Sequence, residues 1–103
     1  MSSNKKSIVK IIGGKWKRKN ISFNDSNNLR PTLNRIRETL FNWLDQDLTN
    51  KKCLDLFSGS GALGFEALSR NALSCTFIES NKSSYLKLIE NKNNLNALNA
   101  KIF

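Results

Sequence analysis

The sequence predicts an α/β fold in which parallel strands alternate with helices. Apolar runs at 52–57, 73–78 and 100–103 have the length and composition of strands. Between these runs, segments 62–70 and 82–93 carry apolar residues at helical spacing, and a glycine-rich stretch follows the first run. Strands that alternate with helices in this way form a parallel sheet with right-handed crossovers.

The N-terminal half is predicted to begin with a β-hairpin. Ile8–Ile12 is a short apolar run, Lys15–Phe23 alternates basic and apolar residues, and the Gly-Gly pair between them is a turn signal. We therefore divide the chain into a basic N-terminal extension at residues 1–50 and the first half of an α/β domain at residues 51–103.

A helix is expected after the hairpin, over about residues 33–44. Pro31, the single proline of the chain, ends any extended segment before this helix. Apolar residues at helical spacing predict that one face of the helix is buried. That face comprises Ile36, Leu40, Trp43 and Leu44.

The positive charge of the chain lies almost entirely in its first third. Residues 1–37 contain ten Lys or Arg and one acid, whereas residues 38–103 contain seven of each. The first segment therefore accounts for the whole net charge of +9. A charge placed this unevenly indicates a polyanionic partner.

Composition also excludes several classes of protein. The chain has neither a secretory signal nor an apolar run long enough to cross a membrane, which predicts a cytoplasmic protein. It has no histidine, so neither a zinc site nor a Ser-His-Asp triad is expected, and no metal is predicted. Cys53 and Cys75 each open an apolar run and are predicted to be small buried residues.

The glycine-rich stretch predicts a nucleotide site. Gly59, Gly61 and Gly64 fit the pattern G-x-G-x-x-G, after a predicted strand and at the start of a predicted helix. Such glycines allow a sharp turn, a close approach of the ligand to the backbone and tight packing of helix on strand. Glu79 ends the next strand, where a carboxylate can accept hydrogen bonds from ribose hydroxyls. These features predict a Rossmann-like fold.

Asp55 favours S-adenosylmethionine over NAD as the nucleotide. It lies four residues before Gly59, inside a strand that is normally wholly apolar in dinucleotide-binding proteins. S-adenosylmethionine carries an ammonium group and a sulfonium, which a carboxylate attracts, whereas it repels a pyrophosphate. The alternative is that Asp55 only accepts hydrogen bonds from N–H groups of the loop.

Three segments, in order and at matching spacing, resemble the bacterial 16S rRNA guanine-N2 methyltransferases. The longest, Leu54–Arg70, is similar to the cofactor motif of that family, and Leu29–Leu44 is similar to the segment just before it. Ile11–Trp16 is similar to the family's N-terminal start. The resemblance implies a Rossmann-like, S-adenosylmethionine-dependent methyltransferase fold that is truncated after the start of its third strand.

The resemblance also implies roles for individual residues, in a protein whose partner is ribosomal RNA or the small ribosomal subunit. The residues implied to hold S-adenosylmethionine are Asp55, Phe57, Gly59, Gly61, Glu79, Arg30 and Thr32. The residues implied to contact RNA are Lys15, Trp16, Lys17, Arg18, Lys19, Arg30 and Arg35. The cations would neutralise phosphates. Trp16 would either stack on a base or pack the hairpin onto the body of the protein.

The motif that positions the methyl acceptor is absent from this chain. In the family an Asp-Pro-Pro-aromatic or Asn-Pro-Pro-aromatic motif holds the guanine amine in line with the methyl group. The only proline here is Pro31, so no catalytic residue is assigned. We expect Cys53–Phe57 to form an exposed apolar edge and the chain to be weakly stable and to self-associate through it. A non-catalytic RNA-binding module and an NAD-binding fragment are the alternatives.

Overall fold

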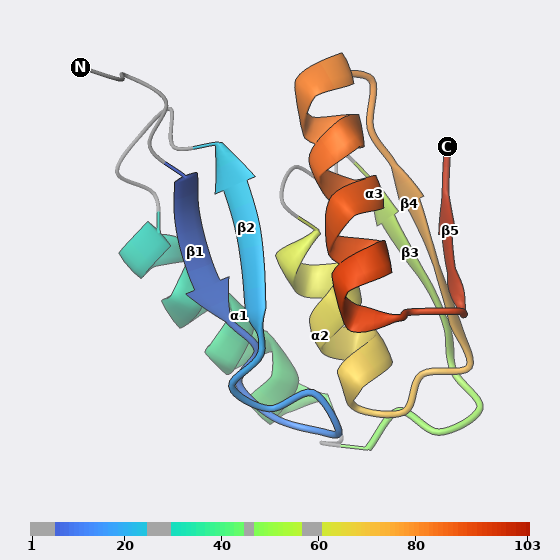
Figure 1. The fold of residues 1–103 in the computed structure, drawn as a ribbon. Helices are drawn as coiled ribbons and strands as arrows, with labels where there is room; N and C mark the ends of the chain where they lie inside the picture. The colour runs from blue at the N-terminus through green and yellow to red at the C-terminus, as the bar shows by residue number, and fades with distance from the viewer. Residues whose placement is uncertain (1–5, 25–29, 45–46, 57–60) are drawn as a thin grey trace.

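The computed structural model describes residues 6–24, 30–44, 47–56 and 61–103. Two antiparallel strands and one helix precede a unit in which strands alternate with helices (Figure 1). The elements in chain order are β1 (Lys6–Lys10), β2 (Asn20–Asn24), α1 (Arg30–Trp43), β3 (Lys52–Leu56), α2 (Ala62–Ser69), β4 (Ser74–Ile78), α3 (Lys82–Leu95) and β5 (Ala100–Ile102).

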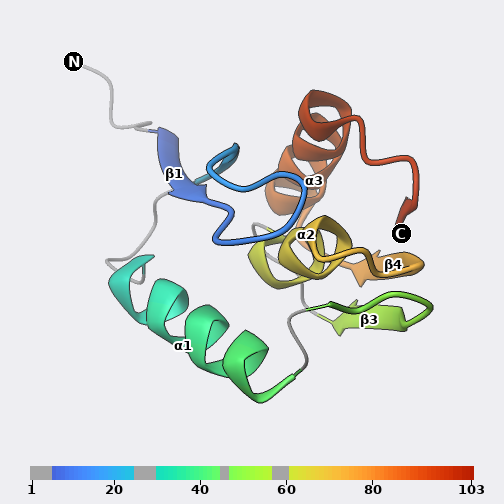
Figure 2. The same cartoon turned by 90° about the horizontal axis from the view of Figure 1, so that it is seen from below.

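The three C-terminal strands form the predicted parallel sheet, and their order in it is β3-β4-β5. Both α2 and α3 cover the same face of this sheet, because successive crossovers that run in one direction share one hand (Figures 1 and 2). β3 is one of the two edge strands of the described sheet, and its Leu54 and Leu56 side chains are 62% and 58% exposed. The predicted exposed edge is therefore present.

The N-terminal hairpin is confirmed, but its second strand is shorter than predicted. β2 begins at Asn20, where it pairs with Lys10, instead of at Lys15. Residues 11–19, called the basic loop from here on, form turns: Arg18 N–H donates to the Ile11 carbonyl at 2.9 Å. Gly14 and Arg18 have φ of +80° and +73°, conformations that a strand does not contain.

Helix α1 begins earlier than predicted, at Arg30, and the predicted buried face is wrong. Trp43 is 83% exposed, and Ile36 and Leu44 are exposed as well, whereas Leu40 is half-buried. Among the side chains of α1 that the structure describes, residues 35–43, the buried ones are Arg37 and Phe41. The helix takes this orientation because Arg37 reaches a buried carboxylate and Phe41 joins the apolar core.

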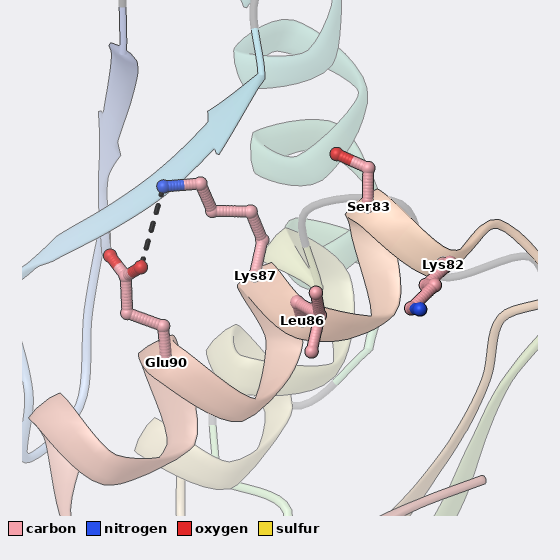
Figure 3. Close-up of a pocket in the computed structure, with 5 residues that line it drawn as sticks. All are labelled: Lys82, Ser83, Leu86, Lys87 and Glu90. Atoms are coloured by element: carbon pink, nitrogen blue, oxygen red, sulfur yellow. Dashed lines mark hydrogen bonds and ion pairs between the residues drawn. The ribbon is translucent and has the colours of Figure 1, made fainter.

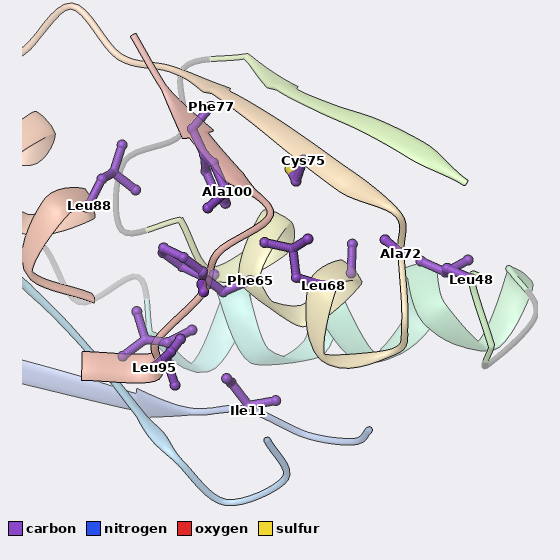
Figure 4. Packing of buried hydrophobic residues seen from close by; sticks show 14 of the residues in the cluster. Ile11, Leu48, Phe65, Leu68, Ala72, Cys75, Phe77, Leu88, Leu95 and Ala100 are labelled. Carbon is purple, nitrogen blue, oxygen red and sulfur yellow. The ribbon is translucent and has the colours of Figure 1, made fainter. Parts of the chain in front are cut away.

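One apolar core contains residues from the hairpin, from helices α2 and α3 and from the sheet (Figure 4). At its centre the rings of Phe65 on α2 and Phe77 on β4 lie 4.7 Å apart between centroids. Cys75 is buried there, as predicted, and Cys53 is half-buried at the periphery. Val9 and Ile21 join the core from the hairpin, so residues on either side of position 50 share it.

Candidate functional site

Two carboxylates lie at the carboxyl ends of neighbouring parallel strands. Asp55 is the next-to-last residue of β3, and Glu79 directly follows β4. The register pairs Leu56 with Ile78, so the two strands end side by side. Ligands of open α/β sheets bind at this end of the strands. The structure therefore brings together the two acidic residues that the sequence singled out.

The Asp55 carboxylate is half-buried beside the start of helix α2. Its Oδ2 accepts a hydrogen bond from Gly64 N–H at 3.2 Å. Burial raises the pKa of Asp55 to about 6, the Gly64 hydrogen bond opposes this rise, and the negative charge of Glu79 adds to it. A cation bound next to this carboxyl group would favour its ionised form and so lower its pKa.

Glu79 is half-buried like Asp55, and local hydrogen bonds fix its position. Its Oε2 accepts a hydrogen bond from Asn81 N–H at 2.9 Å, and its own N–H donates to the Phe103 carbonyl at 3.3 Å. Asn81 also caps helix α3, since its side chain accepts from Ser84 N–H. The carboxylate is therefore held at the rim of the sheet, between β4 and α3.

Of the three glycines in the predicted pattern, Gly61 and Gly64 are described, and Gly61 is the N-cap of α2. Its φ of +79° is left-handed, and a Cβ there would lie 2.5 Å from Leu88 and 2.7 Å from Phe65. Only glycine fits this turn without strain. Phe57 and Gly59 lie outside the described residues. The backbone of Arg30 and Thr32 forms the first turn of α1, and their side chains also lie outside the described part.

Asp55 also borders a small apolar cavity of about 210 Å³ between α1, α2 and β3. Apart from Asp55, its walls are formed by apolar side chains, cysteines and one glycine. They are Leu40, Phe41, Leu44, Leu48, Cys53, Leu54, Leu63, Gly64, Ala67 and Cys75. This cavity places apolar surface next to the carboxylate on the open side of β3.

A second depression, of about 520 Å³, lies on helix α3 and contains none of the predicted cofactor residues (Figure 3). It is lined by Lys82, Ser83, Leu86, Lys87 and Glu90. The Lys87 ammonium and the Glu90 carboxylate form an ion pair at 3.4 Å across one side of it. With Lys82, the lining of this depression carries two lysines and one glutamate.

The basic loop presents its four cations to solvent. Lys15, Lys17, Arg18 and Lys19 are all exposed. Trp16 is half-buried and packs against the apolar core, and the Lys15 ammonium lies 4.9 Å from its ring centroid. The packing role that the sequence allowed for Trp16 is therefore observed. Arg35 is exposed on α1, where it lines a groove of about 590 Å³ between α1 and β1.

The sequence of this chain is similar to those of known proteins. A family described as "Conserved hypothetical protein 95" matches residues 9–103. The chain belongs to this family. It is 49% identical to the ribosomal RNA small subunit methyltransferase D of Escherichia coli K12 over 94 residues, which cover 91% of this chain and 48% of that protein. The predicted resemblance to the rRNA methyltransferases is thus confirmed.

Solved structures confirm the fold. The E. coli protein yhhF, described as a candidate methyltransferase, superimposes with a TM-score of 0.80 at 44% identity, over 93% of this chain and 51% of that one. The T. thermophilus 16S rRNA N2 G1207 methyltransferase RsmC, solved with AdoMet and guanosine, has a TM-score of 0.70 at 22% identity, over 97% and 27% of the two chains. The fold is that of S-adenosylmethionine-dependent methyltransferases. The chain spans about half the length of the curated relatives it matches.

Sequence reasoning missed a set of buried polar residues between α2 and the basic loop. Arg37, Glu66, Ser69 and Arg70 are each at most 5% exposed. Glu66 and Arg70, four residues apart on a helix that is otherwise almost wholly apolar, were the available signal. Within the described residues there is no group of three potential metal ligands and no helix that is long and apolar enough to cross a membrane.

Proposed function

We propose that this chain forms the methyl-donor half of an rRNA methyltransferase that acts on the exocyclic N2 amine of a guanine in small-subunit RNA. One observation supports this most directly: Asp55 and Glu79 lie at adjacent strand ends beside the glycine that begins α2. The E. coli relative, named for ribosomal RNA methylation, supports the substrate class. The N2 position rests on the family resemblance of the sequence motifs.

In this proposal each described residue has a distinct task. The Asp55 carboxylate attracts the ammonium group of S-adenosylmethionine, and Glu79 accepts hydrogen bonds from the ribose hydroxyls. Gly61 lets the ligand approach the backbone at the start of α2. Phe57, Gly59, Arg30 and Thr32 complete the cofactor contacts. S-adenosylmethionine supplies an electrophilic methyl group. The groups that hold the acceptor amine come from outside this chain, because its one proline is Pro31.

Titration of the purified chain with S-adenosylmethionine and, separately, with NAD tests the cofactor. We expect calorimetry to detect S-adenosylmethionine binding and no NAD binding, because the Asp55 charge repels a pyrophosphate. Tight NAD binding that is unchanged in Asp55→Asn would show that the chain is an NAD-binding fragment instead. RNA binding without any nucleotide binding would favour the non-catalytic RNA-binding module.

The exposed cations of the basic loop are proposed to contact the phosphates of the RNA, together with Arg30 and Arg35. Replacing Lys15, Lys17, Arg18 and Lys19 together by Ala should weaken RNA binding and flatten its salt dependence. The logarithmic slope should fall by about 0.7 to 0.9 for each phosphate that the variant no longer neutralises. Fluorescence anisotropy at several salt concentrations measures this slope. The matched control replaces four lysines that are also exposed, Lys51, Lys52, Lys82 and Lys101, by Ala, and an equal loss of affinity in both variants would indicate nonspecific attraction.

The open edge of β3 is proposed to mediate self-association. Its Leu54 and Leu56 side chains are exposed, and β3 lies at an edge of the described sheet, where an edge strand is a template for pairing with another chain. We expect sedimentation to show concentration-dependent oligomers that Leu54→Lys disperses. Leu98→Lys, a substitution of another exposed leucine, should leave them intact. A cooperative melt that is independent of concentration would contradict this expectation.

A further inference from the structure

The buried carboxylate of Glu66 accepts hydrogen bonds from the backbone of the basic loop. The Glu66 side chain is fully buried on helix α2. Its Oε1 accepts from Ile12 N–H and its Oε2 from Gly13 N–H, both at 2.9 Å. These backbone donors lie more than fifty residues away in the sequence. A carboxylate that accepts two successive N–H groups fixes both the position and the direction of that backbone.

Two arginines neutralise this buried carboxylate. Arg70 Nε lies 2.9 Å from Oε2, and Arg37 Nε lies 3.7 Å from Oε1. Arg37 Nη2 also donates to the Lys10 carbonyl at 2.7 Å, at the end of β1. The Arg70 guanidinium lies 4.8 Å from the centroid of the Phe41 ring. The cluster thus joins α1, α2 and the start of the basic loop.

Ser69, three residues further along α2, provides a second attachment. Its Oγ accepts from Trp16 N–H at 2.9 Å and donates to the Gly13 carbonyl at 2.6 Å. The Ser69 carbonyl accepts from Lys15 N–H at 2.7 Å. Gly14, with its φ of +80°, approaches this carbonyl so closely that a Cβ would overlap it. The backbone of the basic loop therefore lies directly against the last turn of α2.

The start of the same helix adjoins two of the candidate cofactor residues, Gly61 and Asp55. Gly61 is its N-cap, and Gly64 N–H donates to Asp55. Helix α2 has eight residues, so about 12 Å of rigid backbone joins the two sites. An apolar contact would also hold the basic loop against the helix, but it would allow the loop to shift along the helix. Hydrogen bonds to a buried carboxylate select one register.

We propose that Glu66 is a positioning residue, which with Arg37, Arg70 and Ser69 sets the place of the RNA-contacting loop relative to the methyl donor. This inference rests on the proposed function, since it assigns the basic loop to RNA. It adds that recognition of RNA depends on buried groups that touch neither RNA nor cofactor. The four cations then bind RNA in a fixed place, because their backbone is held in one arrangement on helix α2, whose first turn adjoins the candidate cofactor site.

The variant Glu66→Gln tests this inference in the 103-residue chain. The neutral amide has one acceptor oxygen in place of two, so one of the two loop N–H groups faces a donor. We expect the amides of Ile12 and Gly13 to exchange faster with solvent, and RNA affinity to fall about tenfold. Affinity for S-adenosylmethionine should stay within about twofold of wild type, since the first turn of α2 is unchanged.

Glu38→Gln is the matched control, because it removes an equal charge from an exposed position on α1. It should change neither amide exchange nor RNA affinity. Ser69→Ala, which keeps the ion pairs of Glu66, is the second variant in case Glu66→Gln does not fold. It should also lower the affinity for RNA and leave the affinity for S-adenosylmethionine unchanged. Wild-type RNA affinity with protected loop amides in the variants would overturn the inference, as would equal losses of RNA and cofactor affinity. A wild-type chain that binds no RNA would instead overturn the proposed function, while amide exchange would still test the positioning.

Discussion

Replacing Asp55 with Asn is expected to weaken S-adenosylmethionine binding about 10- to 100-fold, the worth of one charge-assisted hydrogen bond. Asparagine keeps a side-chain oxygen that can accept from Gly64 N–H, so the start of α2 stays anchored while the charge is lost. The change therefore isolates the attraction between the carboxylate and the ammonium group of the ligand. Calorimetry on both proteins at neutral pH measures it.

The raised pKa of Asp55 adds a pH signature. Because the ligand-free carboxyl titrates at about 6, it is mostly protonated below that pH and must ionise before it attracts a cation. The association constant should rise about tenfold per pH unit below pH 6 and level off above it. In Asp55→Asn the curve should be flat over the same range. A wild-type curve without this rise would show that Asp55 does not contact the ammonium group.

The same pKa predicts the opposite trend for stability without ligand. The folded carboxyl binds its proton more tightly than the unfolded one, whose pKa is near 4, so ionisation favours unfolding. The free energy of unfolding should fall by about 2 kcal/mol as the pH rises from roughly 4 to 6, after allowance for partial solvent screening. Asp55→Asn should remove this fall. Chemical denaturation at several pH values compares the two proteins.

The sheet and the helices packed on it could be predicted from sequence because their signals are local. Apolar runs such as Ser74–Ile78 predict a strand from their own residues, and parallel strands place their carboxyl ends at one edge of the sheet. The proximity of Asp55 and Glu79 follows from that rule alone. The glycine at position 61 was predictable for the same reason, since a glycine pattern between a strand and a helix indicates a sharp turn, and Gly61 has a left-handed φ of +79°.

The orientation of α1 and the shape of the basic loop were not predictable in this way. Hydrophobic periodicity assumes that apolar side chains mark the buried face, and it therefore assigned Ile36 and Trp43 to the interior. A buried arginine breaks the assumption, because its partner is a distant carboxylate that no local pattern reveals. The alternation at Lys15–Lys19 has the period of a strand, yet hydrogen bonds to Ser69 draw this segment into turns. Both errors trace to the polar residues of α2.

Replacing Gly64 with Ala is expected to destabilise the fold by about 2 to 3 kcal/mol, although the same change in an exposed helix would stabilise it by about 1 kcal/mol. The sign reverses because of crowding. A Cβ at this position would overlap the Phe77 ring on β4 and lie 2.9 Å from the Cys75 sulfur. The glycine lets α2 approach the sheet closely, with the Phe65 and Phe77 rings in contact. A thermal melt should show the midpoint lowered by about 10 °C or more.

A second substitution separates this crowding from other effects of the methyl group. Phe77→Leu alone should destabilise the chain, because it removes buried ring atoms and leaves a cavity. In the Gly64→Ala background it creates the space that the new methyl needs, so the double variant should be more stable than the sum of the two single changes indicates. If the stability losses of the two single variants simply add, the Gly64→Ala loss has another cause than crowding against Phe77, for example a weaker hydrogen bond from Gly64 N–H to Asp55. Loss of that hydrogen bond would shift the Asp55 carboxylate, which is proposed to hold the ligand. Gly64→Ala would then also weaken the binding of S-adenosylmethionine.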